Sequence, residues 1–228
     1  GWDYENDIED NNNPEKVYFR DMFLRDLQAI RFFKKALGEG VTNTVNDIDT
    51  SVWKDLWNGK ILQVSGSSQG GLRTIAAGAL DSLSEDNSVG ITILRAGVPW
   101  FADIADSTAT GNIKSDYHPE YKPGLAYFDT ALLAKRIEGS TVTIGAGTGD
   151  SKCPMAGVQA IYNNLKVNAT LNFIQGKGHD ASYSDTLGAS DSSQSKISAG
   201  VSTGTITDSG PSDWTFDPAT GILTISNE

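Results

Sequence analysis

Residues 61–80, ILQVSGSSQGGLRTIAAGAL, run a short apolar strand directly into an alanine-rich helix. The joint between them is GSSQGG, residues 66–71. Small residues at this joint fill little space in the core, and glycine and serine are poor helix formers. Such a joint is either a flexible turn or a tight backbone bend that function requires. We predict a strand over residues 60–65 and a helix over residues 70–83.

Strands and helices alternate on both sides of this joint. An amphipathic helix is expected over residues 18–37, where apolar residues recur at helical spacing before Gly38. Further strands are expected at 90–96, 141–145 and 169–174, and further helices at 125–136 and 155–165. This order predicts an α/β fold with a mostly parallel sheet. Because active sites of such sheets form at the carboxyl ends of strands, the strand ends at Ser68, Asp150 and His179 are of interest.

The composition limits the classes of partner. The chain has 228 residues, 38% of them hydrophobic, and a formal net charge of −11. So acidic a surface argues against DNA, RNA or an anionic membrane as a partner. The single cysteine, Cys153, excludes an intrachain disulfide, and no apolar run approaches the ~20 residues of a membrane span. The first residues do not form a signal peptide.

The composition changes near residue 182. We expect residues 1–182 to form the α/β domain and residues 183–228 to form a linker rich in Ser, Thr and Gly that ends in a small β appendage. Residues 214–225 alternate on either side of a Pro-Ala-Thr-Gly turn, which predicts a β-hairpin.

The joint matches the G-x-S-x-G pattern of a nucleophile elbow, with Ser68 at its centre. In such an elbow the bend needs small neighbours and lifts the serine hydroxyl clear of the sheet. The backbone N–H of Gln69 would then point toward a developing oxyanion. A serine also needs a base, and the order Ser, Asp, His is met by Ser68, Asp150 and His179.

Other polar and aromatic residues have less specific interpretations. We expect His118 to lie on the surface or in a pocket wall, and Cys153 to be a buried small residue rather than a nucleophile. Asp129 and Asp180 are expected to be solvated or to cap helices. Trp100 and Phe101 follow a strand end, and they fit plain core or the lining of a substrate pocket equally well.

Three segments together resemble carbohydrate esterase family seven, the acetyl xylan esterases and cephalosporin C deacetylases of the α/β-hydrolase superfamily. They are residues 18–31 (YFRDMFLRDLQAIR), the elbow GSSQGG, and residues 127–137 (YFDTALLAKRI) followed by GDSKCP at 149–154 and GHD at 178–180. The resemblance covers roughly residues 14–182. It implies that Ser68, Asp150 and His179 are catalytic and that no metal or organic cofactor is used.

The sequence departs from the family pattern in three ways. Ser67 replaces a glycine of the elbow, and Asp180 stands where Glu is usual. The family's domain also begins with several strands that carry a second oxyanion donor, and these have no counterpart here. We therefore expect this chain to be the carboxyl-terminal part of a larger esterase, with an exposed sheet edge.

The resemblance implies a serine esterase that removes acetyl groups from xylan or acetylated sugars through an acyl-enzyme. Two alternatives stay open: an α/β-hydrolase-type peptidase, and a non-catalytic surface or carbohydrate-binding protein that keeps the scaffold. The expected partner is an acetylated carbohydrate, together with association between copies or with the missing amino-terminal portion. A secreted or cell-surface bacterial location is expected.

Overall fold

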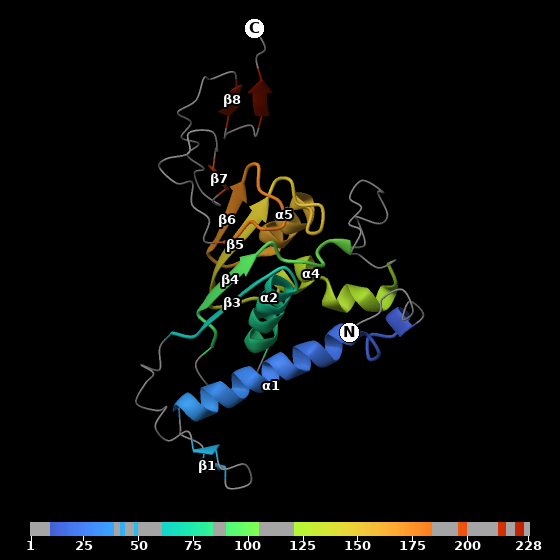
Figure 1. The fold of residues 1–228 in the computed structure, drawn as a ribbon, viewed down its shortest axis with the longest axis vertical. Helices are drawn as coiled ribbons and strands as arrows, with labels where there is room; N and C mark the ends of the chain where they lie inside the picture. Colours follow the sequence, from blue (N-terminus) through green and yellow to red (C-terminus); the bar gives the residue numbers. More distant parts are fainter. Residues whose placement is uncertain are drawn as a thin grey trace.

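The computed structural model describes residues 10–38, 42–43, 48–49, 61–83, 90–104, 121–183, 196–199, 214–217 and 222–225. Figure 1 shows the course of the chain. Its helices are η1 (Asp10–Asn12), α1 (Tyr18–Gly38), α2 (Gln69–Ser82), η3 (Pro123–Phe128), α4 (Thr130–Ala134) and α5 (Met155–Asn164). Its strands are β1 (Thr42–Asn43), β2 (Ile48–Asp49), β3 (Gln63–Ser67), β4 (Ile93–Gly97), β5 (Thr141–Gly147), β6 (Ala169–Ile174), β7 (Lys196–Ala199), β8 (Trp214–Asp217) and β9 (Ile222–Ile225).

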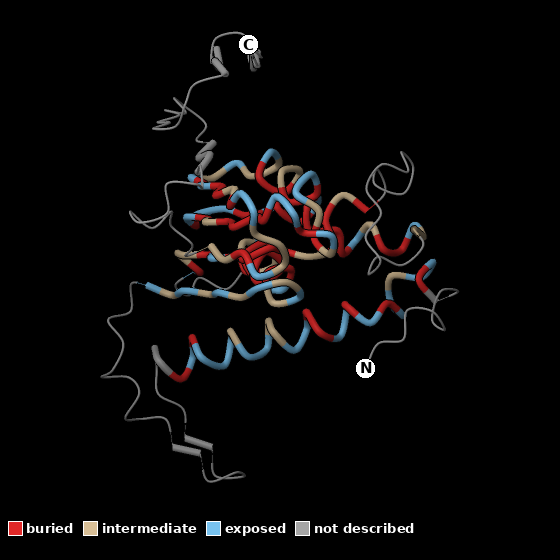
Figure 2. Tube along the Cα trace, turned by 45° about the horizontal axis from the view of Figure 1, so that its top comes forward, coloured by how far each residue is buried: buried red, intermediate tan, exposed pale blue. Residues whose placement is uncertain are grey.

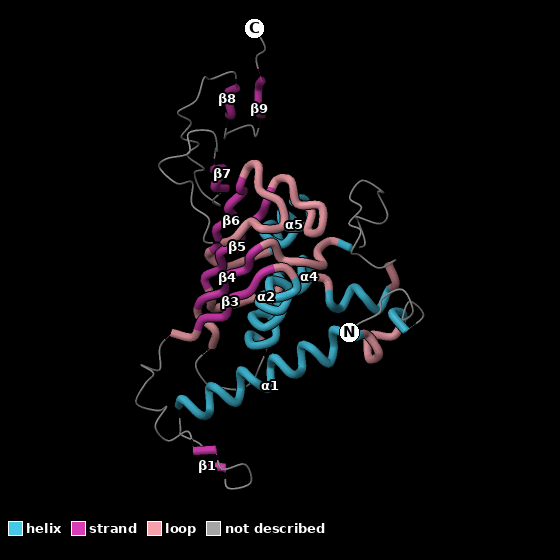
Figure 3. The backbone as a smooth tube through the Cα atoms, viewed as in Figure 1, coloured by secondary structure: helices cyan, strands magenta, loops and turns pink. Residues whose placement is uncertain are grey.

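The central sheet has the strand order β3-β4-β5-β6-β7. The first four strands are parallel, and β7 joins β6 in the antiparallel direction. Figure 3 shows α2, α4 and α5 beside these strands. The alternation of strands and helices therefore gives the mostly parallel α/β sheet that the sequence predicts.

One face of the sheet carries the core. Leu94, Ile144 and Leu171 have no exposed surface, and they pack in one cluster with Leu72 and Ile75 of α2. Figure 2 shows this burial concentrated where helices cover the strands. The aligned carboxyl ends of β3 to β6 are thereby held in fixed register.

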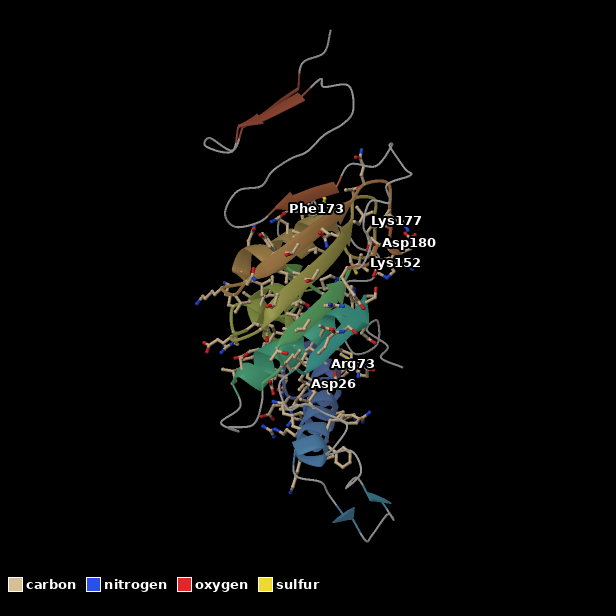
Figure 4. The ribbon with its side chains drawn as sticks, turned by 90° about the vertical axis from the view of Figure 1, so that its left-hand side faces the viewer. Asp26, Arg73, Lys152, Phe173, Lys177 and Asp180 are labelled. Carbon is tan, nitrogen blue, oxygen red and sulfur yellow. The ribbon has the colours of Figure 1, made fainter. Side chains whose placement is uncertain are left out.

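Helix α1 packs against the β3 end of the helical layer through an apolar stripe. Phe19, Met22 and Phe23 are buried on it. Two ion pairs fasten α1 to α2: Arg73 donates from Nε and Nη2 to Asp26, and the buried Lys34 ammonium donates to Asp81. Figure 4 shows Asp26 and Arg73 side by side.

One predicted helix is divided in the structure. Residues 125–136 were expected to form a continuous helix, but the chain forms the 3-10 helix η3 and then α4. The division falls at Asp129, which has extended backbone angles and accepts a hydrogen bond from Ala131 N at 2.8 Å. A helix-capping residue in the middle of the segment ends one helix and starts the next.

Two separate hairpins complete the described chain. Strands β1 and β2 pair with each other, and so do β8 and β9, which agrees with the hairpin predicted over residues 214–225. The boundary after residue 182 stays a prediction. Strand β7 lies beyond it and adds to the edge of the central sheet.

Candidate active site

Ser68 stands in a strained bend between β3 and α2. Its φ is 57°, a left-handed value that non-glycine residues rarely adopt. A Cβ on Gly66 would lie 2.4 Å from the carbonyl oxygen of Gly70, and one on Gly71 would lie 2.8 Å from the carbonyl oxygen of Gly97. These two glycines are therefore required by close backbone approach. A Cβ on Gly70 would meet nothing within 4 Å.

Hydrogen bonds from the neighbouring strand hold the bend in place. Ser68 N donates to the carbonyl oxygen of Gly97 at 2.9 Å. The carbonyl oxygen of Ser68 accepts from Leu72 N at 3.0 Å and from Trp100 N at 3.1 Å. The backbone on both sides of the hydroxyl is thus fixed by α2 and by the segment after β4.

Ser68, His179 and Asp150 form a chain of hydrogen bonds. The Oγ of Ser68 lies 2.9 Å from Nε2 of His179, and Nδ1 of His179 lies 3.0 Å from Oδ2 of Asp150. Because a carboxylate only accepts hydrogen bonds, Nδ1 carries the proton and Nε2 is left to accept from the serine hydroxyl. This tautomer can remove a proton from Ser68.

Two loops bring the acid and the imidazole together. Thr148 N donates to the carbonyl oxygen of Ile174, and Gly149 N donates to that of Lys177, so the loops after β5 and β6 are joined. A Cβ on Gly147 would lie 2.3 Å from the carbonyl oxygen of Gly178. The glycine therefore permits the close approach that places Asp150 beside His179.

The carboxylate is buried and the imidazole is accessible. The side chain of Asp150 has 0% exposed surface, and Oδ1 accepts from Lys152 N at 2.8 Å and Cys153 N at 2.9 Å. The His179 side chain is 30% exposed. The backbone donors fix the carboxylate, while the ring keeps an open side toward a substrate.

An oxyanion donor is available at the start of α2. Gln69 is the first residue of that helix, and the first N–H groups of a helix have no acceptor within it. The positive end of the helix dipole lies at the same point. Both features favour a developing negative charge beside Ser68.

The segment after β4 is strained and is held by the start of α4. Val98, Phe101 and Asp103 all have positive φ. Asp129 accepts from Asp103 N and Ile104 N, each at 2.9 Å. The residue is 2% exposed, and burial raises the pKa of its carboxyl against the opposing effect of the N–H donors. Asp129 caps α4 as expected, but the alternative that it is solvated is wrong.

Thr130 supports the same segment. Its hydroxyl donates to the carbonyl oxygen of Trp100 at 2.7 Å, and its N–H donates to that of Phe101 at 2.9 Å. Sequence reasoning missed this support of the elbow. The only signal for it was an Asp-Thr pair in the middle of an apolar segment.

The two aromatic residues lie mainly in the core. Phe101 has 0% exposed surface, and its ring centroid lies 4.7 Å from that of Phe19. This burial favours the core alternative for Phe101, and its assignment to a substrate pocket stays a prediction. Trp100 is only partly buried, and its role in a pocket stays a prediction.

Cys153 lies beside Asp150, to which its N–H donates. It is 3% exposed, and burial, followed by the Asp150 carboxylate, raises the pKa of its thiol to about 12. Asp150, Cys153 and His179 could offer three metal ligands within 4.8 Å of one another. Metals prefer the thiolate, which this raised pKa disfavours, and the Asp150–His179 hydrogen bond already accounts for the nearness of those two residues.

The remaining candidates lie at the edge of the site or outside the described residues. Asp180 is exposed, and hydrogen bonds led by the one from Lys177 lower its pKa. Figure 4 shows Lys152, Lys177 and Asp180 gathered at one border of the sheet. His118 lies outside the described residues. No helix in the described ranges has both the length and the apolar character to cross a bilayer.

Comparisons with known proteins place this chain near the acetyl xylan esterases. Residues 114–186 match the family model described as acetyl xylan esterase (AXE1). The acetyl esterase Axe7A of Xylanibacter ruminicola is 30% identical over an alignment of 115 residues, and the match covers 47% of this chain and 24% of that protein. These matches confirm the resemblance to acetyl xylan esterases.

Two solved structures share the fold. The acetyl xylan esterase from Paenibacillus sp. R4 aligns with a TM-score of 0.54 and 21% identity over 75% of this chain and 50% of that one. Acetyl xylan esterase 1 from Thermoanaerobacterium sp. JW/SL YS485 aligns with a TM-score of 0.53 and 21% identity over 74% and 50%. The fold is that of the α/β-hydrolases. The chain spans about a quarter of the curated relative's length and half of each solved structure.

Proposed function

We propose that this chain, which resembles the acetyl xylan esterases, is a serine carboxylic ester hydrolase that removes acetyl groups from xylan or other acetylated sugars. The observation that carries the proposal is the hydrogen-bonded chain from Ser68 Oγ through His179 to the buried Asp150 carboxylate. It stands at the carboxyl ends of parallel strands, where this fold forms active sites.

The acylation step follows from the tautomer. His179 Nε2 takes the proton of Ser68 as Oγ attacks the acetyl carbonyl carbon, and Asp150 stabilises the resulting imidazolium. The tetrahedral oxyanion accepts a hydrogen bond from Gln69 N–H. When the intermediate collapses, the C–O bond to the sugar breaks, and Nε2 returns the proton to the departing sugar oxygen. The acetyl group stays on Ser68.

The deacylation step repeats this sequence with water. His179 takes a proton from the water as its oxygen attacks the acetyl-serine carbonyl. The Ser68 Oγ–carbon bond then breaks, Ser68 recovers its proton from Nε2, and acetic acid leaves and ionises to acetate in water. The backbone bonds to Ser68 N and O keep the hydroxyl at the same place in both steps.

The test measures acetate release from acetylated xylan and turnover of p-nitrophenyl acetate by the parent chain and by Ser68→Ala. We expect turnover that depends on Ser68 and covalent labelling of Ser68 by a fluorophosphonate. Amide cleavage without acetate release would favour a peptidase. Absence of labelling on the folded chain would favour a non-catalytic role.

A secreted or cell-surface site of action is proposed with this substrate, because xylan is a polymer outside the cell that degrades it. The net charge of −11 would repel anionic polymers, whereas it does not oppose the binding of a neutral polysaccharide. Fractionation of a producing culture, followed by detection of the chain in the medium or on the cell surface, tests this location.

A further inference from the structure

A polar groove lies beside the elbow, between the first half of α1 and the start of α2. Its volume is about 330 Å³, which falls within the ~300–1,000 Å³ of small-molecule sites. The groove is lined from α1 by Tyr18, Asp21 and Arg25, and from α2 by Gln69 and Arg73.

The position of the groove relates it to the proposed chemistry. Gln69 follows Ser68 directly, and its backbone N–H is the candidate oxyanion donor. The same residue also lines the groove. Ser68, Asp150 and His179 do not line the groove, so Gln69 is the residue that connects it to the site. The part of the substrate that reaches the groove is the remainder of the molecule beyond the ester.

The charges around the groove are balanced. Three cationic and three anionic side chains line it, namely Lys16, Arg25, Arg73, Glu15, Asp21 and Asp26. Arg73 and Asp26 already neutralise each other through two hydrogen bonds. A balanced set of this kind gives no net attraction to an anion or a cation, and it offers donors and acceptors to a neutral ligand with many hydroxyl groups.

Tyr18 adds an aromatic ring to this polar lining. It is 40% exposed at the start of α1. A tyrosine presents an apolar ring and a polar hydroxyl together, which suits the alternating C–H and O–H surface of a pyranose. The groove thus combines the two kinds of contact that a sugar ring offers.

We propose that this groove is a subsite for the neutral carbohydrate chain of the substrate, with Tyr18 as its aromatic contact. The proposal rests on the esterase function proposed above and specifies which residues hold the sugar. It predicts that the groove contributes to reactions of acetylated oligosaccharides and contributes little when the leaving group is small and carries no sugar.

The test compares Tyr18→Ala with the parent chain on acetylated xylotriose and on p-nitrophenyl acetate. We expect KM for the trisaccharide to rise about tenfold, the effect of losing one aromatic contact, while p-nitrophenyl acetate turnover stays nearly unchanged. Tyr18→Phe keeps the ring and should retain most of the affinity. Tyr127→Ala is the matched control, since Tyr127 is 70% exposed and does not line the groove.

A binding measurement decides the proposal without catalysis. In a Ser68→Ala background, calorimetry should show that acetylated xylotriose binds and that adding Tyr18→Ala weakens its Kd about tenfold. Equal losses on both substrates, equal effects of Tyr18→Ala and Tyr127→Ala, or no binding at millimolar concentrations would overturn the groove assignment. Intact binding without acetate release by the parent chain would instead count against the esterase function.

Discussion

Replacing Gly66 by alanine should remove activity by moving the elbow. The added Cβ would lie 2.4 Å from the Gly70 carbonyl oxygen, whereas ordinary contact begins at 3.4 Å, so the backbone must separate by about 1 Å. The Ser68–His179 hydrogen bond is 2.9 Å long, and a shift of that size takes it beyond bonding distance. A misplacement of ~1 Å costs about 10²-fold in rate, and overpacking costs about 1–3 kcal/mol of stability.

The control for this change is Gly70→Ala in the same motif. A Cβ there meets nothing within 4 Å, so stability should be unchanged or higher by up to about 1 kcal/mol. The assay is p-nitrophenyl acetate turnover at matched folded protein, with urea unfolding as the stability measure and Ser68→Ala as the blank. Turnover by Gly66→Ala close to that of the parent, or equal losses in both variants, would refute the argument from close packing.

The remaining predictions concern the base, the buried thiol, the carboxyl-terminal residues and the sheet edge. His179→Ala should abolish hydrolysis while His118→Ala leaves most of it, and equal losses would show that the base is misassigned. Because the pKa of Cys153 is about 12, iodoacetamide at pH 8 should leave the folded thiol unmodified. The unfolded thiol loses its proton near pH 9, whereas the folded thiol keeps it to about pH 12. The free energy of unfolding should therefore fall between pH 9 and 12. Urea titrations of the parent chain and of Cys153→Ala check this. Deleting residues 201–228 should leave turnover of a small acetyl ester largely intact, since β8 and β9 pair only with each other among the described strands, and a loss of soluble yield would contradict this. The chain should self-associate through the β3 edge, because β3 pairs with β4 alone among the described strands, and a monomer in size-exclusion chromatography would contradict this.

The elbow could be predicted from sequence because its chemistry is local. A strand, a run of small residues and a helix follow one another within residues 61–80, and the glycines have a direct steric reason. The order of Ser68, Asp150 and His179 was also readable, since each follows a strand of a parallel sheet. Parallel strands place their carboxyl ends at the same edge of the sheet, so the order can be predicted without knowing the loop conformations.

The support of the elbow could not be predicted in this way. It depends on Asp129 and Thr130, which reach the segment after β4 from about 30 residues further along the chain. The positive φ of Val98 is equally invisible, because a β-branched residue is a poor candidate for that conformation. Hydrogen bonds between distant parts of the chain impose these strained backbone conformations, and no local sequence pattern predicts such bonds. The division of the helix expected over residues 125–136 has a local cause instead, the cap that Asp129 provides for α4.

The two faces of the sheet explain why association is expected at an edge. Parallel sheets are usually apolar on both faces, but here the aligned row Ser65, Arg95, Thr143 and Thr170 is polar and at least partly accessible. A polar face gains little from being covered. The β3 edge differs, because β3 pairs with β4 alone in the described part of the chain, and an apolar groove of about 320 Å³ lies beneath it. A strand that adds there can both complete backbone hydrogen bonds and bury apolar surface, which the polar face cannot offer.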